Sequence, residues 1–552
     1  AISGYLITSL IVKDVEAGTF SFWDFYERRA RRILPAMFIV MVCCIPFAWM
    51  WMAPIELKAF STSVMSVCLF ASNFLFWRQS GYFDAVAELK PLLHTWSLSV
   101  EEQYYIIFPI ALLSLWRLGR RNAIWSIALV AILSLALSEY ASRSQPSANF
   151  YMLPTRAWEL IAGALSSFAI VRPSILRDNF LSLAGLAAVA LSVFIYNETF
   201  PFPSLYALPP VLGTCAILVF ARQGTLVGSL LSLKPVVGIG LISYSAYLWH
   251  QPLFAFARIR SMTEPTWQLM LGLSMIALAL AYLSWRFVEV PIRRRGAGPF
   301  SSRRMVFSTF SLVAAAFIAA GLAGHFSKGF PGRIPSDAAY IAGFSEDRNP
   351  RDDCLSTNER PLPPNQACLY GFDKEQPQFA ILGDSHAHAL AFELGKALSN
   401  RSSGLIEFTQ AGCPPIYSYR YMYGDKINDC NSYHMDAMDQ LRHMPNVTTV
   451  LLAARWPLYI HLTFFNNGEG GIEEGGNKIT LLKDDFKSEA EADIISQIGE
   501  RYQSSIAELL SLGKNVVLIY PQPEVGWNVP DYLYKSILVG ADIKRPLSTR
   551  YK

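Results

Sequence analysis

The chain has 552 residues, of which 52% are hydrophobic and only 16% are charged. Soluble domains carry about 25% charged residues, so much of this chain is expected to lie in a membrane. The formal net charge of +4 is too small to indicate a nucleic-acid partner, and the basic residues stand in short runs beside apolar segments.

A membrane-crossing helix needs about 20 mostly apolar residues. Eleven stretches approach this pattern, at 1–13, 33–53, 59–78, 102–118, 123–140, 154–171, 180–196, 206–221, 236–254, 267–286 and 304–324. The basic runs at 28–32 and 293–304 are expected in the cytoplasm. Counting spans back from 293–304 places the loop at 79–94 outside, together with everything after 324. Two full spans between 33 and 78 would break this alternation, so one of the two is expected to be re-entrant or interfacial.

The most polar stretch beside a span is HTWSLSVEEQYY at 94–105. Ionisable groups at membrane depth usually face a cavity and mark a pathway or a reaction site. His94 and Glu101 are seven residues apart, a spacing that puts both on one face of a helix. His94 or Glu101 could serve as a base for a hydroxyl, with Ser97 at the helix entry; the alternative is a structural His94–Glu101 pair.

Other polar residues in the first half fall in three motifs, RAWEL at 156–160, SYSAYLWHQP at 243–252 and WRFVEVPIR at 285–293. Arg156 and Glu159 of the first motif could support chemistry or form an ion pair that locks helices together. Arg28, Arg29 and Arg32 could bind the phosphates of a donor at the cytoplasmic face, or they could only set the topology.

Together these motifs resemble the acyltransferase-3 family of integral membrane acyltransferases. The resemblance covers 1–295 and includes ISGYLIT at 2–8 and FYERRARRILP at 25–35. It implies transfer of an acyl group, usually acetyl from cytoplasmic acetyl-CoA, to a sugar hydroxyl of an envelope glycan, with no permanently bound cofactor. The family has one further leading helix that carries an Arg and a His, so we expect the family's first helix to be missing here.

After 295, the sequence predicts a linker with the last span at 296–325, a Pro- and Gly-rich tether at 326–373, and an α/β domain at 374–552. A Gly- and Glu-rich segment at 464–484 is expected to be a loop. An even set of cysteines in an exported domain predicts disulfides, which sequence proximity assigns to Cys354–Cys368 and Cys413–Cys430. No Cys or His spacing indicates a metal site.

The strongest motif of this domain is the apolar segment 378–383 that runs into Asp384 and Ser385. A Ser between a strand and a helix lies at the helix N-terminus, where backbone N–H groups favour developing negative charge. The alternative is that Asp384 and Ser385 only cap the helix.

With QAGCPP at 410–415 and strands at 447–454 and 515–520, this segment resembles the SGNH hydrolase family, in the form fused behind acyltransferase-3 domains. The resemblance makes Ser385 the nucleophile, Gly412 an oxyanion N–H donor and Asp384 a supporting residue. Arg455 follows the strand where the family has an Asn, and no Asp-x-x-His block is found. His386, His388, His434 and His443 stand in no such context, so either the chain stops before that block or the domain binds glycan without catalysis.

These observations favour an O-acyltransferase in a bacterial inner membrane, multi-pass, with its C-terminal α/β/α domain in the periplasm. The expected partners are the lipid bilayer, acyl-CoA and a surface glycan such as lipopolysaccharide O-antigen. The alternatives are a membrane-anchored exported esterase and a transporter of acyl groups or glycan with a non-catalytic binding domain.

Overall fold

The computed structural model divides the chain into two compact units, Ala1–Ala339 and Tyr340–Lys552. This division falls within the segment 326–373 that the sequence assigns to a tether. The structure describes residues 1–80, 87–197, 200–261, 265–294, 300, 302–344, 349–357, 360–371, 376–423, 426–465, 480–481, 491–526 and 528–539. Most of the predicted loop 464–484 and of the predicted cytoplasmic linker 296–304 lies outside the described residues.

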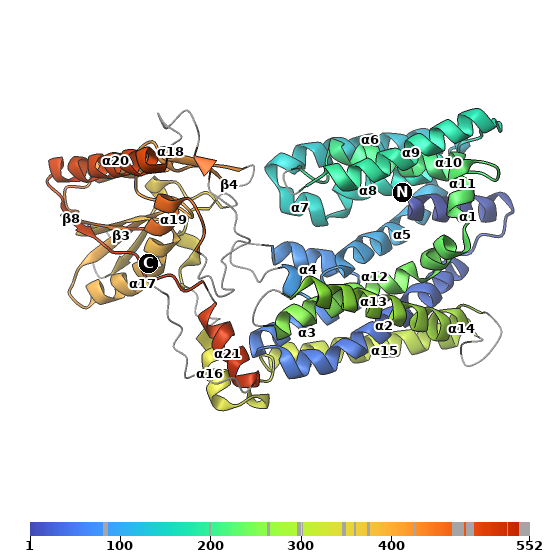
Figure 1. Cartoon of the computed structure of the whole chain (residues 1–552), viewed down its shortest axis with the longest axis horizontal. Coiled ribbons are helices and arrows are strands. Elements are labelled where there is room, and N and C mark those ends of the chain that lie inside the picture. The colour runs from blue at the N-terminus through green and yellow to red at the C-terminus, as the bar shows by residue number, and fades with distance from the viewer. Residues whose placement is uncertain are drawn as a thin grey trace. The chain divides into compact units, whose positions relative to one another are not determined.

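The first unit is helical (Figure 1). Its helices are α1 (Ile2–Glu16), α2 (Phe22–Trp51), α3 (Pro54–Cys68), α4 (Ser72–Arg78), α5 (Thr95–Trp116), α6 (Arg120–Ser144), α7 (Pro146–Tyr151), α8 (Leu153–Ser166), α9 (Ile175–Ile195), α10 (Leu208–Phe220), α11 (Leu226–Leu231), α12 (Lys234–Arg260), α13 (Trp267–Ser284), the π-helix η3 (Trp285–Glu289), α14 (Val290–Arg293) and α15 (Arg303–Phe326). A further helix, α16 (Ser336–Gly343), crosses the division between the units.

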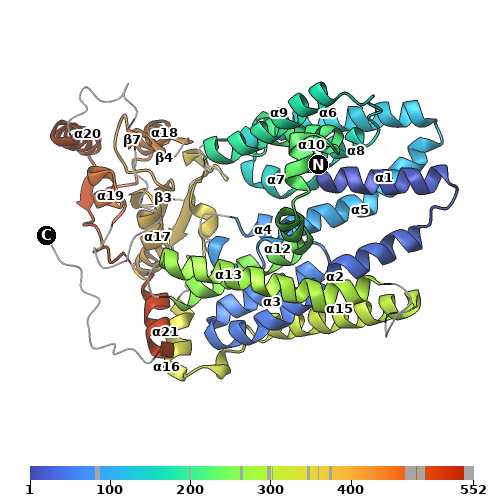
Figure 2. The ribbon, with the colours of Figure 1, turned by 45° about the vertical axis from the view of Figure 1, so that its right-hand side comes forward.

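The helices of the first unit form two groups, which Figures 1 and 2 show from two directions. In one group α6, α8, α9 and α10 pack together, and in the other α2, α3, α12, α13 and α15 do so. The unit has two apolar cores, one among α2, α3, α12, α13 and α15 and the other among α1, α5, α6 and α8; α2 and α5 contribute residues to both. Small residues allow close approach: a Cβ on Gly185 of α9 would lie 2.5 Å from the carbonyl oxygen of Gly213 of α10.

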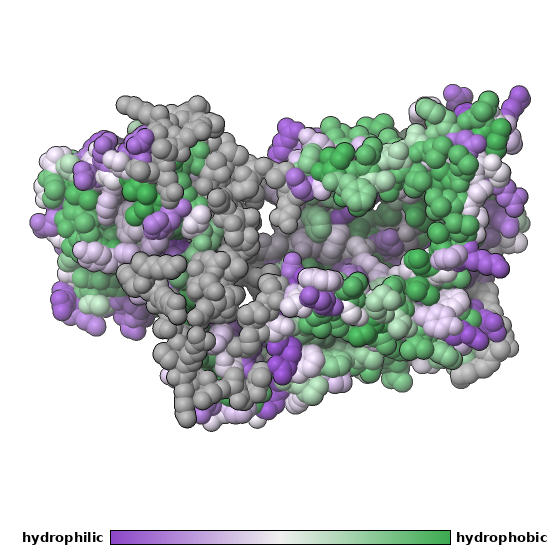
Figure 3. Space-filling view, viewed as in Figure 1, coloured by the Kyte–Doolittle hydropathy of each residue, from purple (hydrophilic) through white to green (hydrophobic). Residues whose placement is uncertain are grey.

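Five helices of the described residues are long and apolar enough to cross a membrane: Phe22–Trp51, Arg120–Ser144, Ile175–Ile195, Trp267–Arg293 and Arg303–Phe326. Hydrophobic side chains cover much of the visible face of this unit (Figure 3). The predicted span 33–53 lies in the continuous α2, whereas 59–78 is divided between α3 and α4. Phe70, between them, has a positive φ of 50°. That one of the two segments is re-entrant or interfacial stays a prediction.

The second unit combines helices with two sheets. Its elements are β1 (Cys368–Gly371), β2 (Phe379–Gly383), α17 (Ser385–Ser399), β3 (Gly404–Thr409), β4 (Arg420–Tyr423), β5 (Lys426–Asp429), α18 (Cys430–Arg442), β6 (Thr449–Ala453), α19 (Trp456–His461), β7 (Thr480–Leu481), α20 (Glu491–Ser511), β8 (Asn515–Leu518) and α21 (Val529–Val539). The larger sheet has the order β1-β3-β2-β6-β8, and the smaller one has the order β5-β4-β7. The predicted α/β domain is confirmed.

The register of the larger sheet brings three strand ends together. Strands β3, β2, β6 and β8 are parallel, and β1 runs antiparallel to β3. Gly383, the last residue of β2, pairs with Thr409 of β3 and with Ala453 of β6. The residues that follow these ends therefore share one edge of the sheet, which is where ligands bind in open parallel sheets.

Both predicted disulfides are present in the second unit. Cys354 bonds to Cys368, and Cys413 bonds to Cys430. The remaining cysteines, Cys43, Cys44, Cys68 and Cys215, are free thiols in the first unit. The second disulfide joins the loop after β3 to the first residue of α18, so it fixes one of the segments at the carboxyl edge of the sheet.

Candidate active sites

His94 lies at the N-terminal end of α5 and faces α12. His94 is only 8% exposed. Its ring centroid is 5.0 Å from that of Tyr247 and 5.6 Å from that of His250. Neither ring nitrogen of His94 has a partner at full hydrogen-bond geometry among the described residues, and the backbone of Pro91 is the neighbour that interacts with the ring. Buried polar groups are rarely left unsatisfied, so this imidazole is available to a ligand or a water molecule.

Tyr247 connects the start of α5 to α12. Its hydroxyl donates a hydrogen bond to the carbonyl oxygen of His94 and lies 2.7 Å from the Ser97 hydroxyl oxygen. The Ser97 hydroxyl also donates to the His94 carbonyl oxygen at 3.5 Å, so either hydroxyl can be the donor between Ser97 and Tyr247. Ser97 therefore acts on the neighbouring helix and does not cap α5, whose N-cap residue is His94. The sequence motif contained Tyr247, but only tertiary structure shows this contact.

Glu101 has a different environment from His94. Its carboxylate accepts hydrogen bonds from Ser3 of α1, at 3.0 Å, and from the Tyr105 hydroxyl, at 3.1 Å. Seven residues of helix separate His94 from Glu101 by about 10 Å along the axis. His94 precedes the first residue of α5, and its ring contacts α12 whereas the Glu101 carboxylate contacts α1. No hydrogen bond or ion pair between the two side chains is found in the described structure, and their sharing of one helix face stays a prediction.

The predicted supporting residues Arg156 and Glu159 form an ion pair with 3.3 Å between a guanidinium nitrogen and a carboxylate oxygen. The Arg156 guanidinium also lies 4.9 Å from the ring centroid of Trp96, within the range of a cation–π interaction. This contact joins the RAWEL motif of α8 to the polar stretch at 94–105. Arg156 and Glu159 thus border the residues that begin α5.

The three arginines proposed for phosphate binding lie in different surroundings on α2. Arg28 forms an exposed ion pair with Asp14 at 3.2 Å. The Arg29 guanidinium lies 4.7 Å from the ring centroid of Tyr105, on the interior side of the helix, while Arg32 is exposed. Arg28 stands apart from the other two, whereas Arg29 and Arg32 are close enough to interact electrostatically with each other and with Glu102 of α5. Arg32 is the most accessible of the three for a phosphate.

In the second unit, Ser385 is the first residue of α17 and is partly buried. Asp384 is the N-cap residue: its Oδ1 accepts the His386 backbone N–H at 2.8 Å. Its Oδ2 accepts the Arg455 backbone N–H at 2.9 Å and the Tyr459 hydroxyl at 2.7 Å. Asp384 thus caps the helix, as the alternative interpretation proposed, and it also ties the Ser385 turn to the segment after β6.

Gly412 follows β3 at the same edge of the sheet. Its φ of +73° favours glycine, and its carbonyl oxygen accepts a hydrogen bond of 2.7 Å from the Tyr421 hydroxyl. Arg455, where the resembled family has an Asn, follows β6 and forms an ion pair with Glu524 beyond β8. The segments after β2, β3, β6 and β8 therefore all contribute to this edge. The guanidinium of Arg455 at this edge is already paired with a carboxylate.

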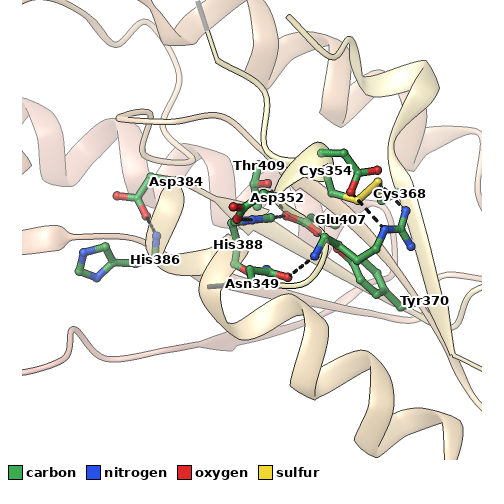
Figure 4. Close-up of polar contacts among 12 residues, drawn as sticks. Asn349, Asp352, Cys354, Cys368, Tyr370, Asp384, His386, His388, Glu407 and Thr409 are labelled. Atoms are coloured by element: carbon green, nitrogen blue, oxygen red, sulfur yellow. Dashed lines mark hydrogen bonds and ion pairs between the residues drawn. A yellow bond between two sulfur atoms is a disulfide. The ribbon is translucent and has the colours of Figure 1, made fainter. Parts of the chain in front are cut away.

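His388, one turn after Ser385, belongs to a separate buried network (Figure 4). Its Nδ1 lies 2.6 Å from a carboxylate oxygen of Glu407, which also accepts hydrogen bonds from the hydroxyls of Tyr370 and Thr409. Its Nε2 lies 3.7 Å from Asp352. Because these contacts direct the imidazole toward β1, β3 and the 349–354 segment, His388 is engaged in structure and does not serve Ser385 as a base.

The other histidines considered from the sequence also have separate environments. His434 is buried against the ring of Tyr417, and burial lowers its pKa to about 4. His443 is exposed at the end of α18, where its Nδ1 bonds to the Asp439 carbonyl oxygen at 2.8 Å. Figure 4 shows the His386 ring pointing away from the His388 network. Among the described residues, no imidazole is found in hydrogen-bond contact with the Ser385 hydroxyl.

Comparison with known proteins agrees with this two-part architecture. Residues 1–286, more than half of the chain, match the family described as an acyltransferase domain. The chain belongs to this acyltransferase family. Residues 353–551 match the family described as an SGNH domain fused to AT3 domains. With five helices suited to crossing a membrane, this acyltransferase-family chain is a multi-pass membrane protein.

Several curated proteins of this acyltransferase type are similar to the chain. YrhL of Bacillus subtilis (strain 168) is 30% identical over 330 residues, which cover 55% of this chain and 50% of YrhL. O-acetyltransferase OatA of Staphylococcus aureus (strain NCTC 8325 / PS 47) is 28% identical over 324 residues, 54% of this chain and 52% of OatA.

Peptidoglycan O-acetyltransferase OatA of Listeria monocytogenes serovar 1/2a (strain ATCC BAA-679 / EGD-e) is 28% identical over 324 residues, 53% of this chain and 50% of that protein. The matches therefore span about half the length of these relatives. No solved structure matches the chain.

Proposed function

We propose that this protein O-acetylates a polysaccharide of the bacterial cell envelope. The observation that carries the proposal is the presence, on one chain, of an acyltransferase family match and an SGNH match whose Ser385 begins a helix at the carboxyl edge of a parallel sheet. The names of the relatives, O-acetyltransferase and peptidoglycan O-acetyltransferase, support acetyl as the group and an envelope glycan as the acceptor.

In the proposed reaction, the first unit takes the acetyl group from acetyl-CoA on the cytoplasmic side. Arg32 is exposed and suits a phosphate of the donor, and Arg29 lies inside beside Tyr105. His94 is the base or hydrogen-bond donor at the opposite end of the pathway, because its two ring nitrogens are buried and have no partner at full hydrogen-bond geometry within the described structure. Glu101, with Ser3 and Tyr105, lies between these positions.

The second unit, placed outside by the last span, then receives the acetyl group. The carrier is a hydroxyl or thiol group that has been acetylated from acetyl-CoA with release of CoA. The Ser385 Oγ attacks the acetyl carbonyl, the bond between the carbonyl and the carrier breaks, and the carrier leaves with the serine proton. The glycan hydroxyl then attacks the acetyl-serine and its proton returns to Ser385. Backbone N–H groups at the start of α17 and in the Gly412 segment stabilise the developing oxyanion. Asp384 holds the Ser385 turn through its three hydrogen bonds.

Two envelope polysaccharides are candidates for the acceptor of the acetyl group. Resemblance to the fused acyltransferase-3 type favours lipopolysaccharide O-antigen or a related surface polysaccharide, whereas two of the three relatives, YrhL and the Listeria OatA, are named for peptidoglycan. All these acceptors present sugar hydroxyls to the outer side of the membrane. The chemistry derived for Ser385 is the same for each of them.

Mass spectrometry of purified glycans tests the proposal directly. Cells that express the full-length chain should gain 42 Da per acetyl group in either the surface polysaccharide or the peptidoglycan, and cells with Ser385→Ala should not. Equal acetylation by both chains would contradict the role of Ser385. A lower acetyl content with the wild-type chain than with Ser385→Ala would instead support an exported esterase.

A further inference from the structure

Three buried tyrosines pack together next to the Ser385 edge of the second unit. Tyr419, Tyr421 and Tyr459 are 0%, 4% and 1% exposed. The ring centroid of Tyr419 lies 5.9 Å from that of Tyr421 and 5.9 Å from that of Tyr459, and the Tyr421 and Tyr459 centroids are 6.5 Å apart. These separations are those of directly interacting aromatic rings, so the three side chains form one tyrosine cluster.

The hydroxyls of the tyrosine cluster reach two different segments of the candidate site. Tyr459 of α19 donates to Asp384 Oδ2 at 2.7 Å, and Asp384 precedes Ser385. Tyr421 of β4 donates to the Gly412 carbonyl oxygen at 2.7 Å. Tyr419 donates to the backbone carbonyl of Tyr459 at 3.2 Å. The cluster therefore links the nucleophile turn to the glycine of the proposed oxyanion site through side-chain contacts.

We propose that the tyrosine cluster is a positioning device that sets the distance between Ser385 and the Gly412 backbone, and that Tyr421 and Tyr459 are its two contact residues. This inference rests on the proposed function of Ser385. An oxyanion donor acts only when it is aimed at the place where charge develops, so the separation of the two segments controls the rate. Neither tyrosine touches the reacting atoms in this arrangement.

The fit of Gly412 against Tyr421 supports this role. A Cβ on Gly412 would lie 2.5 Å from the Tyr421 hydroxyl oxygen, so the glycine backbone rests directly on that hydroxyl. At the other contact, burial and the neighbouring Asp384 carboxylate raise the pKa of Tyr459, which keeps its hydroxyl protonated as the donor to Asp384. One tyrosine hydroxyl therefore makes each contact, that of Tyr421 with Gly412 and that of Tyr459 with Asp384. A Tyr→Phe substitution removes only that hydroxyl.

The test uses the full-length chain in detergent with p-nitrophenyl acetate. Ser385 attacks the ester carbonyl, p-nitrophenolate leaves, and water hydrolyses the acetyl-serine. We expect Tyr421→Phe and Tyr459→Phe each to lower kcat by about 10- to 100-fold with KM changed less than about 2-fold, because alignment is lost while the binding surface remains. The double variant with Tyr421→Phe and Tyr459→Phe should lower kcat by less than the product of the two single fold-decreases, because both hydroxyls act on one distance.

Tyr417→Phe is the matched control. The Tyr417 hydroxyl also donates to a carboxylate, that of Glu508 on α20, and it contacts neither Asp384 nor Gly412 in the described structure. We expect its kcat to stay within about 2-fold of the wild-type value. The thermal midpoints of all three single variants should fall by similar amounts, since each loses one hydrogen bond.

Two outcomes contradict the inference in different ways. If Ser385→Ala abolishes hydrolysis but Tyr421→Phe and Tyr459→Phe retain the wild-type kcat, the tyrosine cluster serves only stability and the proposed role of Ser385 stands. If Ser385→Ala hydrolyses the ester at the wild-type rate, the function proposed for Ser385 fails and the positioning role fails with it.

Discussion

At the residue scale, Asp384 and His94 differ in how the surrounding protein satisfies their polar atoms. Asp384 is 1% exposed and accepts three hydrogen bonds, so its charge is fully satisfied by the protein. His94 is similarly buried but has no partner at full hydrogen-bond geometry for either ring nitrogen within the described residues. An unsatisfied buried group costs stability, which favours a functional explanation for His94 over a structural one.

Substitution of His94 should therefore remove function without unfolding the protein. We expect His94→Ala to lower glycan acetylation in cells by at least about 100-fold, the scale of a lost general base. His325→Ala is a matched control, because His325 is also on a helix of the first unit but already bonds to the Thr62 hydroxyl at 3.1 Å. Acetylation that survives His94→Ala at the control level would exclude the proposed role.

The sequence could predict the position of Ser385 between a strand and a helix because the signal for that position is local. The buried strand β2 ends at Gly383, which has a φ of 155°, and the helix α17 begins two residues later. Tyr459 could not be predicted, because it lies 75 residues from Asp384 in sequence and meets it only after α19 folds onto the sheet edge. The same limit applies to Glu101, whose partner Ser3 is 98 residues away. Residue type and spacing identify a motif but not its tertiary contacts.

At the element scale, helix contacts through glycine hold part of the first unit together. The backbones of α9 and α10 meet at Gly185 and Gly213, where a Cβ on either residue would overlap the carbonyl oxygen of the other. Periodicity predicted both helices from their apolar residues. It could not predict which face would lie against which neighbour, because nearly every face of these segments is apolar.

Gly213→Leu should force α9 and α10 apart. Because an overpacked contact costs about 1–3 kcal/mol, we expect a lower thermal midpoint for the detergent-solubilised chain. Gly272→Leu in α13 is the matched control, since nothing lies within 4 Å of a Cβ at that position. Equal midpoints for the two variants would show that the α9–α10 contact is not tight in solution.

The second unit should lose stability in acid because of His434 on α18. Burial lowers the His434 pKa from 6.5 to about 4, so between these values the unfolded state binds a proton that the folded state does not. Stability from this group is present above pH 6.5 and is lost as the pH falls toward 4, by up to about 3 kcal/mol.

Heating with protease at pH 7 and at pH 4.5 measures this loss as the temperature at which the second unit becomes sensitive to cleavage. His434→Gln should reduce the difference between the cleavage temperatures measured at pH 7 and at pH 4.5. His443→Gln, which changes an exposed histidine at the end of the same helix, should leave the difference unchanged. An undiminished difference in His434→Gln would assign the acid sensitivity to other groups.

At the scale of the whole molecule, the cysteines separate according to unit. The four in the second unit form two disulfides and the four in the first are thiols. This division fits a chain whose second unit matures in an oxidising compartment while its first unit stays in the membrane. Sequence alone could predict both bonds, because each joins cysteines that are close along the chain.

Counting thiols checks this division in the protein made by cells. The denatured full-length chain should take up four maleimide groups without reduction, and eight after reduction, because the sequence contains eight cysteines. Uptake of eight groups before reduction would show that the second unit had not been exposed to an oxidising compartment. The sample should be quenched with acid before denaturation, so that disulfides do not rearrange.

The disulfide between Cys413 and Cys430 has a consequence for control by redox chemistry. Cys413 is the residue after Gly412, so the bond holds the proposed oxyanion segment against α18 without involving Ser385. A reductant would release that segment and leave the serine itself chemically intact. For the reaction proposed at Ser385, a thiol compound would then lower the rate without competing with the substrate.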